Sequence, residues 1–235
     1  MSAAAEAILR DLASVEAERA QRRADAGHAA AVTALKAYQQ QRFRRTYADL
    51  LASAEYAQAA RFFLDELYGP RDFADRDAQF ARVVPALVRL FGADLVDTVA
   101  ALARLHALSE QLDGRMARVI ALPIDAAGYG QAWRAVGTPA ERERQIELTL
   151  RVGNDLERLT RKTLLRQSLR LMRGPAAAAG LGALQSFLEC GFDTFRALRR
   201  PASFLACIAD RERALAAALF DDAADGGGGV LGQLP

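Results

Sequence analysis

Apolar residues recur every three to four positions along most of the chain, and this is the period of an amphipathic α-helix. The pattern is clearest at Phe80, Val83, Val84, Leu87, Leu90 and Phe91. Sustained alternation of apolar and polar positions, which would indicate β-strands, is not found in the sequence. We therefore expect an all-α protein, built as a bundle of about six to eight antiparallel helices with short connections.

Capping residues and helix breakers divide this pattern into separate helices. The strongest start is Thr138-Pro139-Ala140-Glu141, because threonine, proline and glutamate at these positions make a capping box. The helix that follows is expected to continue to about residue 173, with Gly153 marking a bend or a close neighbour. The expected helices cover approximately residues 3–26, 28–52, 55–68, 72–91, 95–122, 139–173, 176–198 and 201–222.

The two ends of the chain differ from its middle. Residues 1–26 form a helical arm whose short apolar stripe of Ile8, Leu12 and Val15 ends before the next arginines. Such an arm docks on the rest of the chain, pairs with a second copy, or frays. Residues 27–222 make the helical-bundle domain, and the Gly-rich residues 223–235 are expected to be a disordered tail.

Composition and charge narrow the class of protein. Hydrophobic residues make up 51% of the 235 positions and charged residues 26%, which is typical of a globular domain. The net charge of +2 gives no strong field, so we do not expect nucleic-acid binding. Two cysteines, Cys190 and Cys207, without a CxxC motif exclude a disulfide scaffold or a zinc module. With neither a signal peptide nor an apolar membrane-spanning stretch, we expect a cytoplasmic protein, and the alanine and arginine bias is typical of a GC-rich bacterium.

One segment, residues 61–70, combines paired aromatic and paired acidic residues. On an α-helix Phe63 and Glu66 share a face, and Phe62 lies one turn from Glu66. Asp65 is then solvated, whereas Glu66 meets the core and needs a partner or a shifted pKa. We consider Arg76, Arg82 and Arg104 as partners for Glu66, and expect a structural ion pair or cap rather than a catalytic acid.

The sequence Phe62-Phe63-Leu64-Asp65-Glu66-Leu67-Tyr68 resembles the signature of the bacterial "FFLEELY motif" proteins. It departs from that signature at Asp65, where the family has glutamate. The Gly69-Pro70 and Asp72-Phe73 pairs look like the usual continuation of the motif. The resemblance implies a bacterial origin, and it implies no activity, ligand or catalytic residue.

Acidic residues and a histidine lie together on the helix expected at residues 95–122. His106, Glu110 and Asp113 share one side of it, and with Glu66 they could form a ligand or metal site between helices. However, the chain has two histidines and no Glu-x-x-His pair, so we expect neither a metal nor a cofactor. We expect His106 to be a core-edge residue bonded to a carboxylate. The ligand-binding candidates are Phe62, Phe63, Glu66, Tyr68, His106 and Glu110.

Basic residues recur at helical spacing near the end of the helix expected at residues 139–173. This stripe could bind phosphate, RNA or an acidic membrane surface. A solvated helix face is the simpler interpretation, and the absence of interleaved aromatic residues argues against stacking on single-stranded bases. The basic-surface candidates are Arg158, Lys162, Arg166, Arg170 and Arg173.

Motifs of the common enzyme classes are missing from the sequence: it contains no Gly-x-Ser-x-Gly, no Walker loop and no Gly-x-Gly-x-x-Gly. We therefore expect no catalytic residue, and the leading hypothesis is a non-enzymatic interaction or regulatory module. It would bind a protein partner or itself through the N-terminal arm or the basic stripe. The alternatives are a small apolar ligand or metal near Glu66 and His106, and an anionic polymer or membrane surface at the basic stripe.

Overall fold

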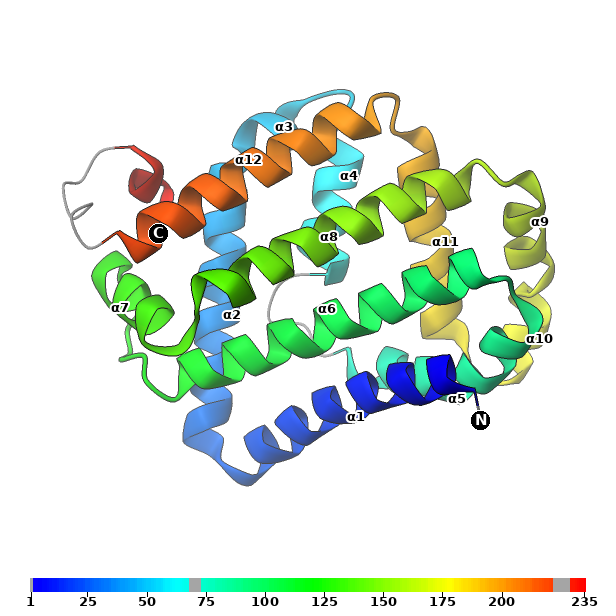
Figure 1. Ribbon diagram of the computed structural model, residues 1–235, viewed down its shortest axis with the longest axis horizontal. Helices are drawn as coiled ribbons and strands as arrows, with labels where there is room; N and C mark the ends of the chain where they lie inside the picture. The colour runs from blue at the N-terminus through cyan, green and yellow to red at the C-terminus, as the bar shows by residue number, and fades with distance from the viewer. Residues whose placement is uncertain (1, 68–72, 222–228) are drawn as a thin grey trace.

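The structure of the protein is a computed structural model that describes residues 2–67, 73–221 and 229–235. Those residues are helical almost throughout and contain no β-strand, which confirms the all-α prediction (Figure 1). The helices are α1 (Ala3–Ala24), α2 (Ala26–Thr46), α3 (Ala48–Ala52), α4 (Ala57–Phe62), the π-helix η1 (Phe63–Leu67), α5 (Ala74–Leu90), α6 (Ala93–Ala117), α7 (Ala126–Val136), α8 (Pro139–Thr160), α9 (Thr163–Leu171), α10 (Arg173–Ala178), α11 (Gly182–Ala197), α12 (Pro201–Phe220) and the 3₁₀-helix η3 (Val230–Gln233).

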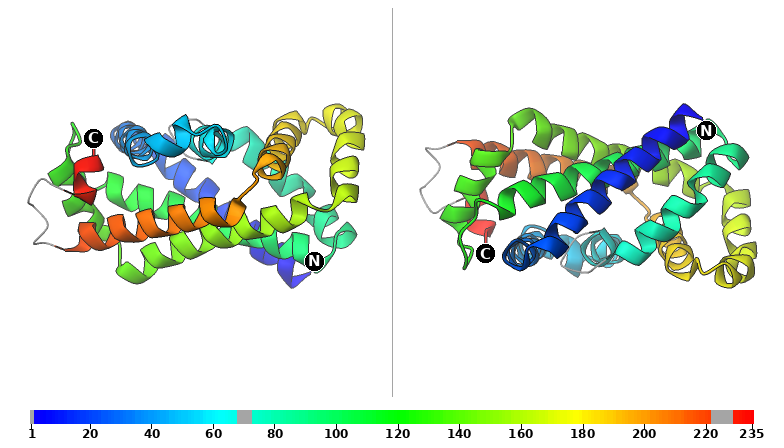
Figure 2. Two further views of the ribbon diagram at one scale, coloured as in Figure 1. Left: turned by 90° about the horizontal axis from the view of Figure 1, so that it is seen from above. Right: turned by 90° about the horizontal axis from the view of Figure 1, so that it is seen from below.

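The long helices lie side by side in one layer. In Figure 1, α6 and α8 run next to each other, with α1 along the outer side of α6 and α12 along α8. Helices α2, α4 and α11 cross behind this layer, as both views of Figure 2 show. Helices α9 and α10 form one end of the molecule, and α7 lies at the opposite end (Figure 1).

The first helix is docked on the rest of the chain, one of the three alternatives considered for it. Ile8 and Leu12 are buried in a cluster with Val84 of α5 and Val96 of α6, and Val15 is also buried. The apolar stripe of α1 is therefore already covered, which stabilises the docked position through burial of apolar surface. Among the described residues, no helix combines the length and the hydropathy that a membrane span requires.

Several helix ends differ from the sequence-based expectation. The capping box at Thr138 is present, and α8 begins at Pro139 as predicted. The helix expected to continue to residue 173 instead ends at Thr160, and the chain turns before starting α9. The helix expected over residues 28–52 is likewise divided at Tyr47, whose buried ring packs beside Phe43. Neither of these two helix breaks has a glycine or a proline between the helices, so the local sequence does not predict the break.

The aromatic and acidic segment adopts a π-helix rather than the expected α-helix. Hydrogen bonds in a π-helix link residues five apart, so the side chains no longer follow the α-helical face pattern. Phe62, Phe63 and Leu64 are buried one after another, Asp65 is exposed and Glu66 is partly exposed. Tyr68 lies outside the described residues.

The last seven residues pack against the core, with Val230 and Leu231 partly buried and Leu234 buried. Leu234 is buried in the cluster that contains Tyr38, Tyr129 and Trp133, and its backbone carbonyl accepts a hydrogen bond from Arg45. The expectation of a disordered tail over residues 223–235 is therefore wrong for residues 229–235, because Leu234 provides apolar surface that the glycine content does not reveal. Residues 222–228 lie outside the described part of the chain.

Candidate functional site

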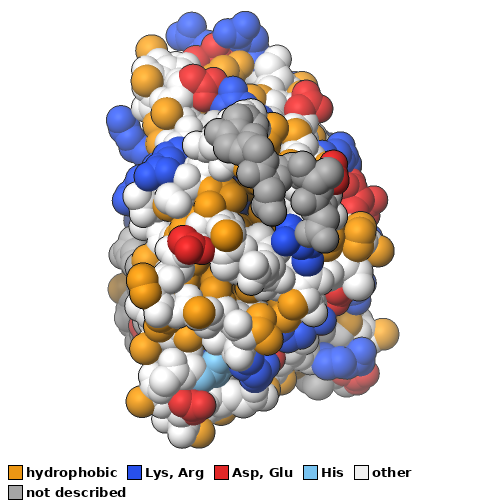
Figure 3. Space-filling model, turned by 90° about the vertical axis from the view of Figure 1, so that its left-hand side faces the viewer, with side chains coloured by type: hydrophobic (Ala, Val, Ile, Leu, Met, Phe, Trp, Pro, Cys, Tyr) orange, Lys and Arg blue, Asp and Glu red, His pale blue; other side chains and the backbone are white. Residues whose placement is uncertain are grey.

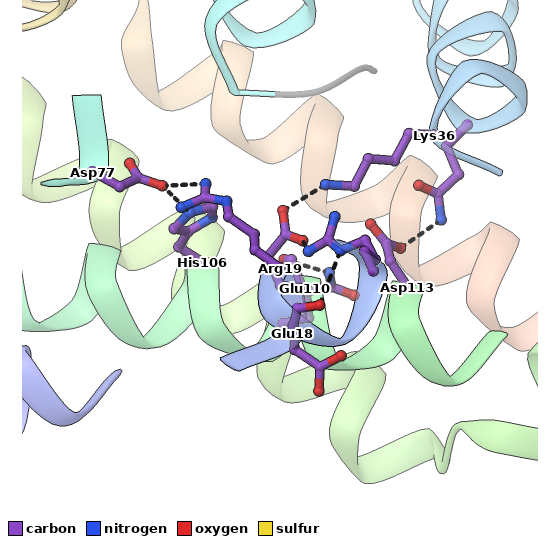
Figure 4. Close-up of polar contacts among 11 residues, drawn as sticks. Glu18, Arg19, Lys36, Asp77, His106, Glu110 and Asp113 are labelled. Carbon is purple, nitrogen blue, oxygen red and sulfur yellow. Dashed lines mark hydrogen bonds and ion pairs between the residues drawn. The ribbon is translucent and has the colours of Figure 1, made fainter. Parts of the chain in front are cut away.

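A network of charged residues joins four helices in the interior of the molecule. Helix α6 contributes His106, Glu110 and Asp113, which lie on one side of that helix as their spacing predicts (Figure 4). Their partners come from α1, α2 and α5, so the network links segments that are distant in the sequence. We refer to these residues as the charged network: Arg19, Arg22, Lys36, Gln39, Asp77, His106, Glu110 and Asp113.

One half of the charged network is centred on Asp77 of α5. Arg19 Nη2 donates to Asp77 Oδ2 over 2.6 Å, and His106 Nε2 lies 2.7 Å from the same oxygen. Arg76 Nε is 3.5 Å from Asp77 Oδ1. Burial raises the pKa of Asp77, but the hydrogen bond and charge of His106, with Arg19 and Arg76, outweigh it and hold the pKa at about 2. Asp77 is therefore an anion at neutral pH, and it ties α1 and α6 to α5.

The other half is centred on Glu110 of α6. Its two carboxylate oxygens accept hydrogen bonds from Arg22 of α1 and Lys36 of α2, while its side chain is 8% exposed. Burial raises the pKa of Glu110, but the charges of Lys36 and Arg22 outweigh it and bring the pKa to about 2. Gln39 Nε2 donates to Asp113 Oδ1 over 3.0 Å, and burial raises the pKa of Asp113. These contacts join α1, α2 and α6.

Sequence analysis identifies the α6 members of this network but misses their partners. Arg19 and Arg22 could have been found, because they continue the α1 stripe of Leu12 and Val15 at spacings of four and three. Both arginines lie on the buried side of α1, where they pair with Asp77 and Glu110 and are not solvated. No comparable sequence feature pairs Lys36 with a carboxylate 74 residues away.

The charged network holds helices together through ion pairs and hydrogen bonds. The Asp77 carboxylate pairs with Arg19 of α1, and the Glu110 carboxylate pairs with Arg22 of α1 and Lys36 of α2. Within the described part of the chain, no three histidine, cysteine or acidic side chains are grouped so that they could hold a metal ion. The side chains of Arg19, Arg22, Lys36 and Arg76 already occupy the space around these acids, so a metal would have to displace them.

The aromatic candidates fill a different part of the core. Phe62 stacks on Phe187 at a centroid distance of 5.8 Å and meets Phe195 edge-on at 6.4 Å, while Phe63 lies 6.1 Å from Phe195. A Cβ atom at Gly191 would lie 3.0 Å from the Phe62 ring, so glycine there permits the close approach. Both rings are thus packed by neighbouring side chains.

Glu66 lies beside Arg76, one of the three arginines that sequence analysis considers for it. Arg76 Nη1 donates to the backbone carbonyl of Glu66 over 2.9 Å. Burial lowers the pKa of Arg76, and the charges of Asp77 and Glu66 offset only part of that effect. The Arg76 guanidinium also lies over the Phe73 and Phe187 rings at 4.1 and 4.3 Å. Arg82 and Arg104 make their contacts elsewhere, with Ala179 and Asp11.

The candidate ligand residues therefore contribute to two packed regions that meet at Arg76 and Asp77. Surface hollows of about 470 and 460 Å³ lie along α1, and none of the candidates that the structure describes (Phe62, Phe63, Glu66, His106 and Glu110) lines either of them. The first hollow is lined by Gln21, Asp25, Gly27, His28, Ala117 and Arg118. The structure thus brings His106 and Glu110 into one network, and places Phe62 and Phe63 in an aromatic cluster.

The basic-surface candidates do not form a continuous helical stripe. Arg158 lies on α8, and the turn at Lys162 separates it from Arg166 and Arg170 on α9. Four of the five pair with acids: Arg158 with Asp155 at 2.5 Å, Lys162 with Asp94 at 3.1 Å, Arg166 with Asp193 at 2.7 Å, and Arg173 with Glu189 at 2.6 Å. Arg170 forms no ion pair with another described residue.

Exposed apolar side chains gather at the α9 end of the molecule. None of the nine residues of α9 is buried, and the helix is strongly amphipathic. The side chains are 77% exposed at Leu164, 79% at Leu171, 50% at Met172, 70% at Leu90 and 41% at Phe91. The ion pair between Lys162 and Asp94 holds the start of α9 beside the turn that follows Phe91. We call these five residues the α9 surface.

At the opposite end of the molecule, beside α7, the exposed apolar side chains are arranged differently. In Figure 3, apolar side chains on that face are dispersed among uncharged atoms and among charged side chains of both signs. Val119 and Leu122 also have half-exposed side chains, on the segment that joins α6 to α7. Dispersed apolar residues of this kind are usual on protein surfaces.

Comparison with known proteins gives a family without an assigned activity. Searches of the curated proteins and of the solved structures find no match. A family model described as "Domain of unknown function (DUF8198)" matches residues 18–226. The matched stretch begins one residue before Arg19, and so includes the whole charged network and the α9 surface. The chain belongs to the DUF8198 family.

Proposed function

We propose that the protein is a non-enzymatic interaction module that binds another protein through the α9 surface. The observation that carries this proposal is the exposure of Leu164 and Leu171 on a helix with no buried residue. An amphipathic helix ordinarily turns its apolar side chains toward the core. Covering these leucines with a partner would remove apolar surface from water, which is the main favourable term in protein association.

The N-terminal arm is less suited to this role than α9. Its apolar stripe of Ile8, Leu12 and Val15 is already buried, and Arg19 and Arg22 are engaged with Asp77 and Glu110. A partner that bound this stripe would first have to separate α1 from α5 and α6. The α9 surface requires no such rearrangement.

Binding of an anionic polymer or membrane through the basic stripe has less support. Arg158, Lys162, Arg166 and Arg173 are each paired with an acid, so the surface presents nearly balanced charge. Affinity for polyanions depends on unpaired cations that release counterions. The alternative of a ligand or metal near Glu66 and His106 also has less support, because ion pairs and aromatic rings occupy that region.

We expect the protein to act in the bacterial cytoplasm, as its composition suggests. The division into a helical arm of residues 1–26 and a bundle domain of residues 27–222 also stays a prediction. The interaction proposal does not depend on either expectation, because it rests on side chains that are exposed in the folded chain.

The test uses chemical cross-linking in the native host cells, and it compares two double variants that each introduce two glutamates. Leu164→Glu with Leu171→Glu alters the α9 surface, and Val119→Glu with Leu122→Glu is the control at the opposite end. All four side chains are at least half exposed, so both variants should fold, which circular dichroism verifies. We expect the proteins cross-linked to the wild-type chain to be lost from the α9 variant and retained by the control. Identical cross-linked proteins for both variants would contradict the proposal.

A further inference from the structure

We infer that the partner presents an acidic amphipathic helix to the α9 surface. This inference rests on the proposed function, and it adds the chemical class of the partner. Three features of the α9 surface carry it: the spacing of its leucines, the charges beside them, and the absence of acids from α9 itself.

The spacing of the exposed leucines suits a helix as the partner. Leu164 and Leu171 are seven residues apart, so they lie on one side of α9 and about 10 Å apart along its axis. A helix packed alongside α9 can place one apolar residue per turn between them, as in other helix–helix contacts. Met172, next to Leu171, extends the strip with an adaptable side chain, and Leu90 and Phe91 add exposed apolar surface at the same end of the molecule, where Lys162 pairs with Asp94.

The charges around the strip favour an acidic partner. Arg170 and Arg89 are exposed, each precedes an exposed leucine of the α9 surface, and neither forms an ion pair with another described residue. Arg166, by contrast, is held by Asp193. Glutamates or aspartates that flank the leucines of a partner helix would therefore find two cations available.

The same charges disfavour a second copy of the chain as the occupant. Residues 163–171 contain Arg166 and Arg170 and no acid, so two α9 helices packed together would oppose like charges. An anionic lipid surface is also disfavoured. Membrane binding by an amphipathic helix scales with its buried apolar area and its positive charge, and α9 has nine residues and two arginines, one of which is held by Asp193.

The inference can be tested with two labelled synthetic peptides that share the same leucine positions. One carries glutamate at the positions that flank the leucines, and the other carries lysine. Fluorescence polarisation against the full chain should show the glutamate peptide binding about fivefold tighter, since two exposed charge pairs separate the peptides. Added salt should reduce that preference, and Leu164→Glu with Leu171→Glu should abolish binding of both peptides.

A charge-reversed variant provides the matched control. Arg89→Glu with Arg170→Glu leaves the leucines in place and should transfer the preference to the lysine peptide. Equal binding of the two peptides to the wild-type chain, or binding of neither, would overturn the acidic-helix inference. Sedimentation of the chain with phosphatidylserine vesicles would also overturn the inference, if that sedimentation depends on Leu164. If cellular cross-links still depend on Leu164 and Leu171 while the peptides fail, the interaction proposal stands and the acidic helix is wrong.

Discussion

Glu110 shows how a buried charge can hold three helices together. Its carboxylate bonds to Arg22 and Lys36, which belong to two other helices, and all three side chains are largely buried. Removing a carboxylate from water costs several kcal/mol, and attraction to the two cations offsets that cost. The arrangement is therefore sensitive to the loss of a single member.

Replacement of Glu110 by glutamine should destabilise the fold strongly. The variant would leave Arg22 and Lys36 buried beside each other without a counter-charge, at a cost of about 3–5 kcal/mol. Urea unfolding measures this loss. The control is Glu16→Gln, because the Glu16–Arg23 pair is more than half exposed and should contribute about 0–1 kcal/mol. Equal losses for the two variants would show that the Glu110 cluster contributes no more than a surface pair.

Stability should also decline in acid because of Asp77 and Glu110. Their pKa values are about 2 in the folded chain, against ordinary values of 3.8 and 4.5. The unfolded chain therefore binds more protons between these values, and the free energy of unfolding falls as the pH falls from about 5 to about 2. Asp113 opposes this trend, since its pKa is raised.

Urea unfolding across this pH range measures the effect, and Glu110→Gln identifies its source. The variant lacks the Glu110 carboxyl, so its free energy of unfolding should decline less steeply than that of the wild-type chain. A decline of equal slope in both proteins would assign the acid sensitivity to other carboxyl groups.

At the scale of helices, the contact between α8 and α12 depends on Gly153. A Cβ atom at this position would lie 2.5 Å from Leu205 Cδ2, and Leu205 is buried. Of the two roles predicted for this glycine, a bend or a close neighbour, the structure shows the close neighbour. The absence of a side chain thus lets α12 approach α8.

Gly153→Ala should destabilise the protein even though alanine favours helices. Overpacking against Leu205 costs about 1–3 kcal/mol, which exceeds the gain in helix propensity of up to about 1 kcal/mol. Gly182→Ala is the control, because no atom lies within 4 Å of its Cβ position and a gain of about 0.4–1 kcal/mol is expected. Thermal and urea unfolding distinguish the two; stabilisation by both substitutions would indicate that Leu205 repacks freely.

The helices that sequence analysis locates well are those with strong local chemistry. Thr138, Pro139 and Glu141 mark the start of α8 because the capping contacts lie within one turn of the chain. The turn at Lys162 and the π-helix after Phe62 have no such local marker. Both are places where tertiary packing takes precedence over the period of the sequence.

The same distinction applies to the charged network. The period of α6 correctly puts His106, Glu110 and Asp113 on one side, because that is a property of one helix. Their partners are set by how α1, α2 and α5 pack, and the chain separations of 29 to 88 residues leave no local pattern to read. The exposed leucines of α9 were missed because their pattern is typical of a buried face.

At the scale of the whole molecule, the last residues complete the core between α2, α6, α7 and α12. Leu234 joins the cluster around Tyr129 and Trp133, and Tyr38 Oη donates to the carbonyl of Pro235 over 3.4 Å. Arg45 also donates to the carbonyl of Leu234. This part of the core is thus closed by a segment far from α2 in the sequence.

Leu234→Ala should therefore destabilise the protein by about 2–5 kcal/mol, the usual cost of removing a buried leucine. The control, Gly232→Ala, has no atom within 4 Å of its Cβ position and should change the free energy of unfolding by less than about 0.5 kcal/mol. Chemical unfolding monitored by Trp133 fluorescence is suitable, because Trp133 belongs to the same cluster. Similar stability of the two variants would show that the tail is not part of the cooperative fold.

The position of Leu234 also affects the chain during its synthesis. Tyr38 and Pro235 are 197 residues apart, so α2 is made on the order of 10–40 s before its last neighbour at about 5–20 residues per second. Over that interval the surface that Leu234 later covers is open on the nascent chain. Chaperones that bind exposed apolar segments have this time to act, and they must dissociate before Leu234 can pack against the cluster.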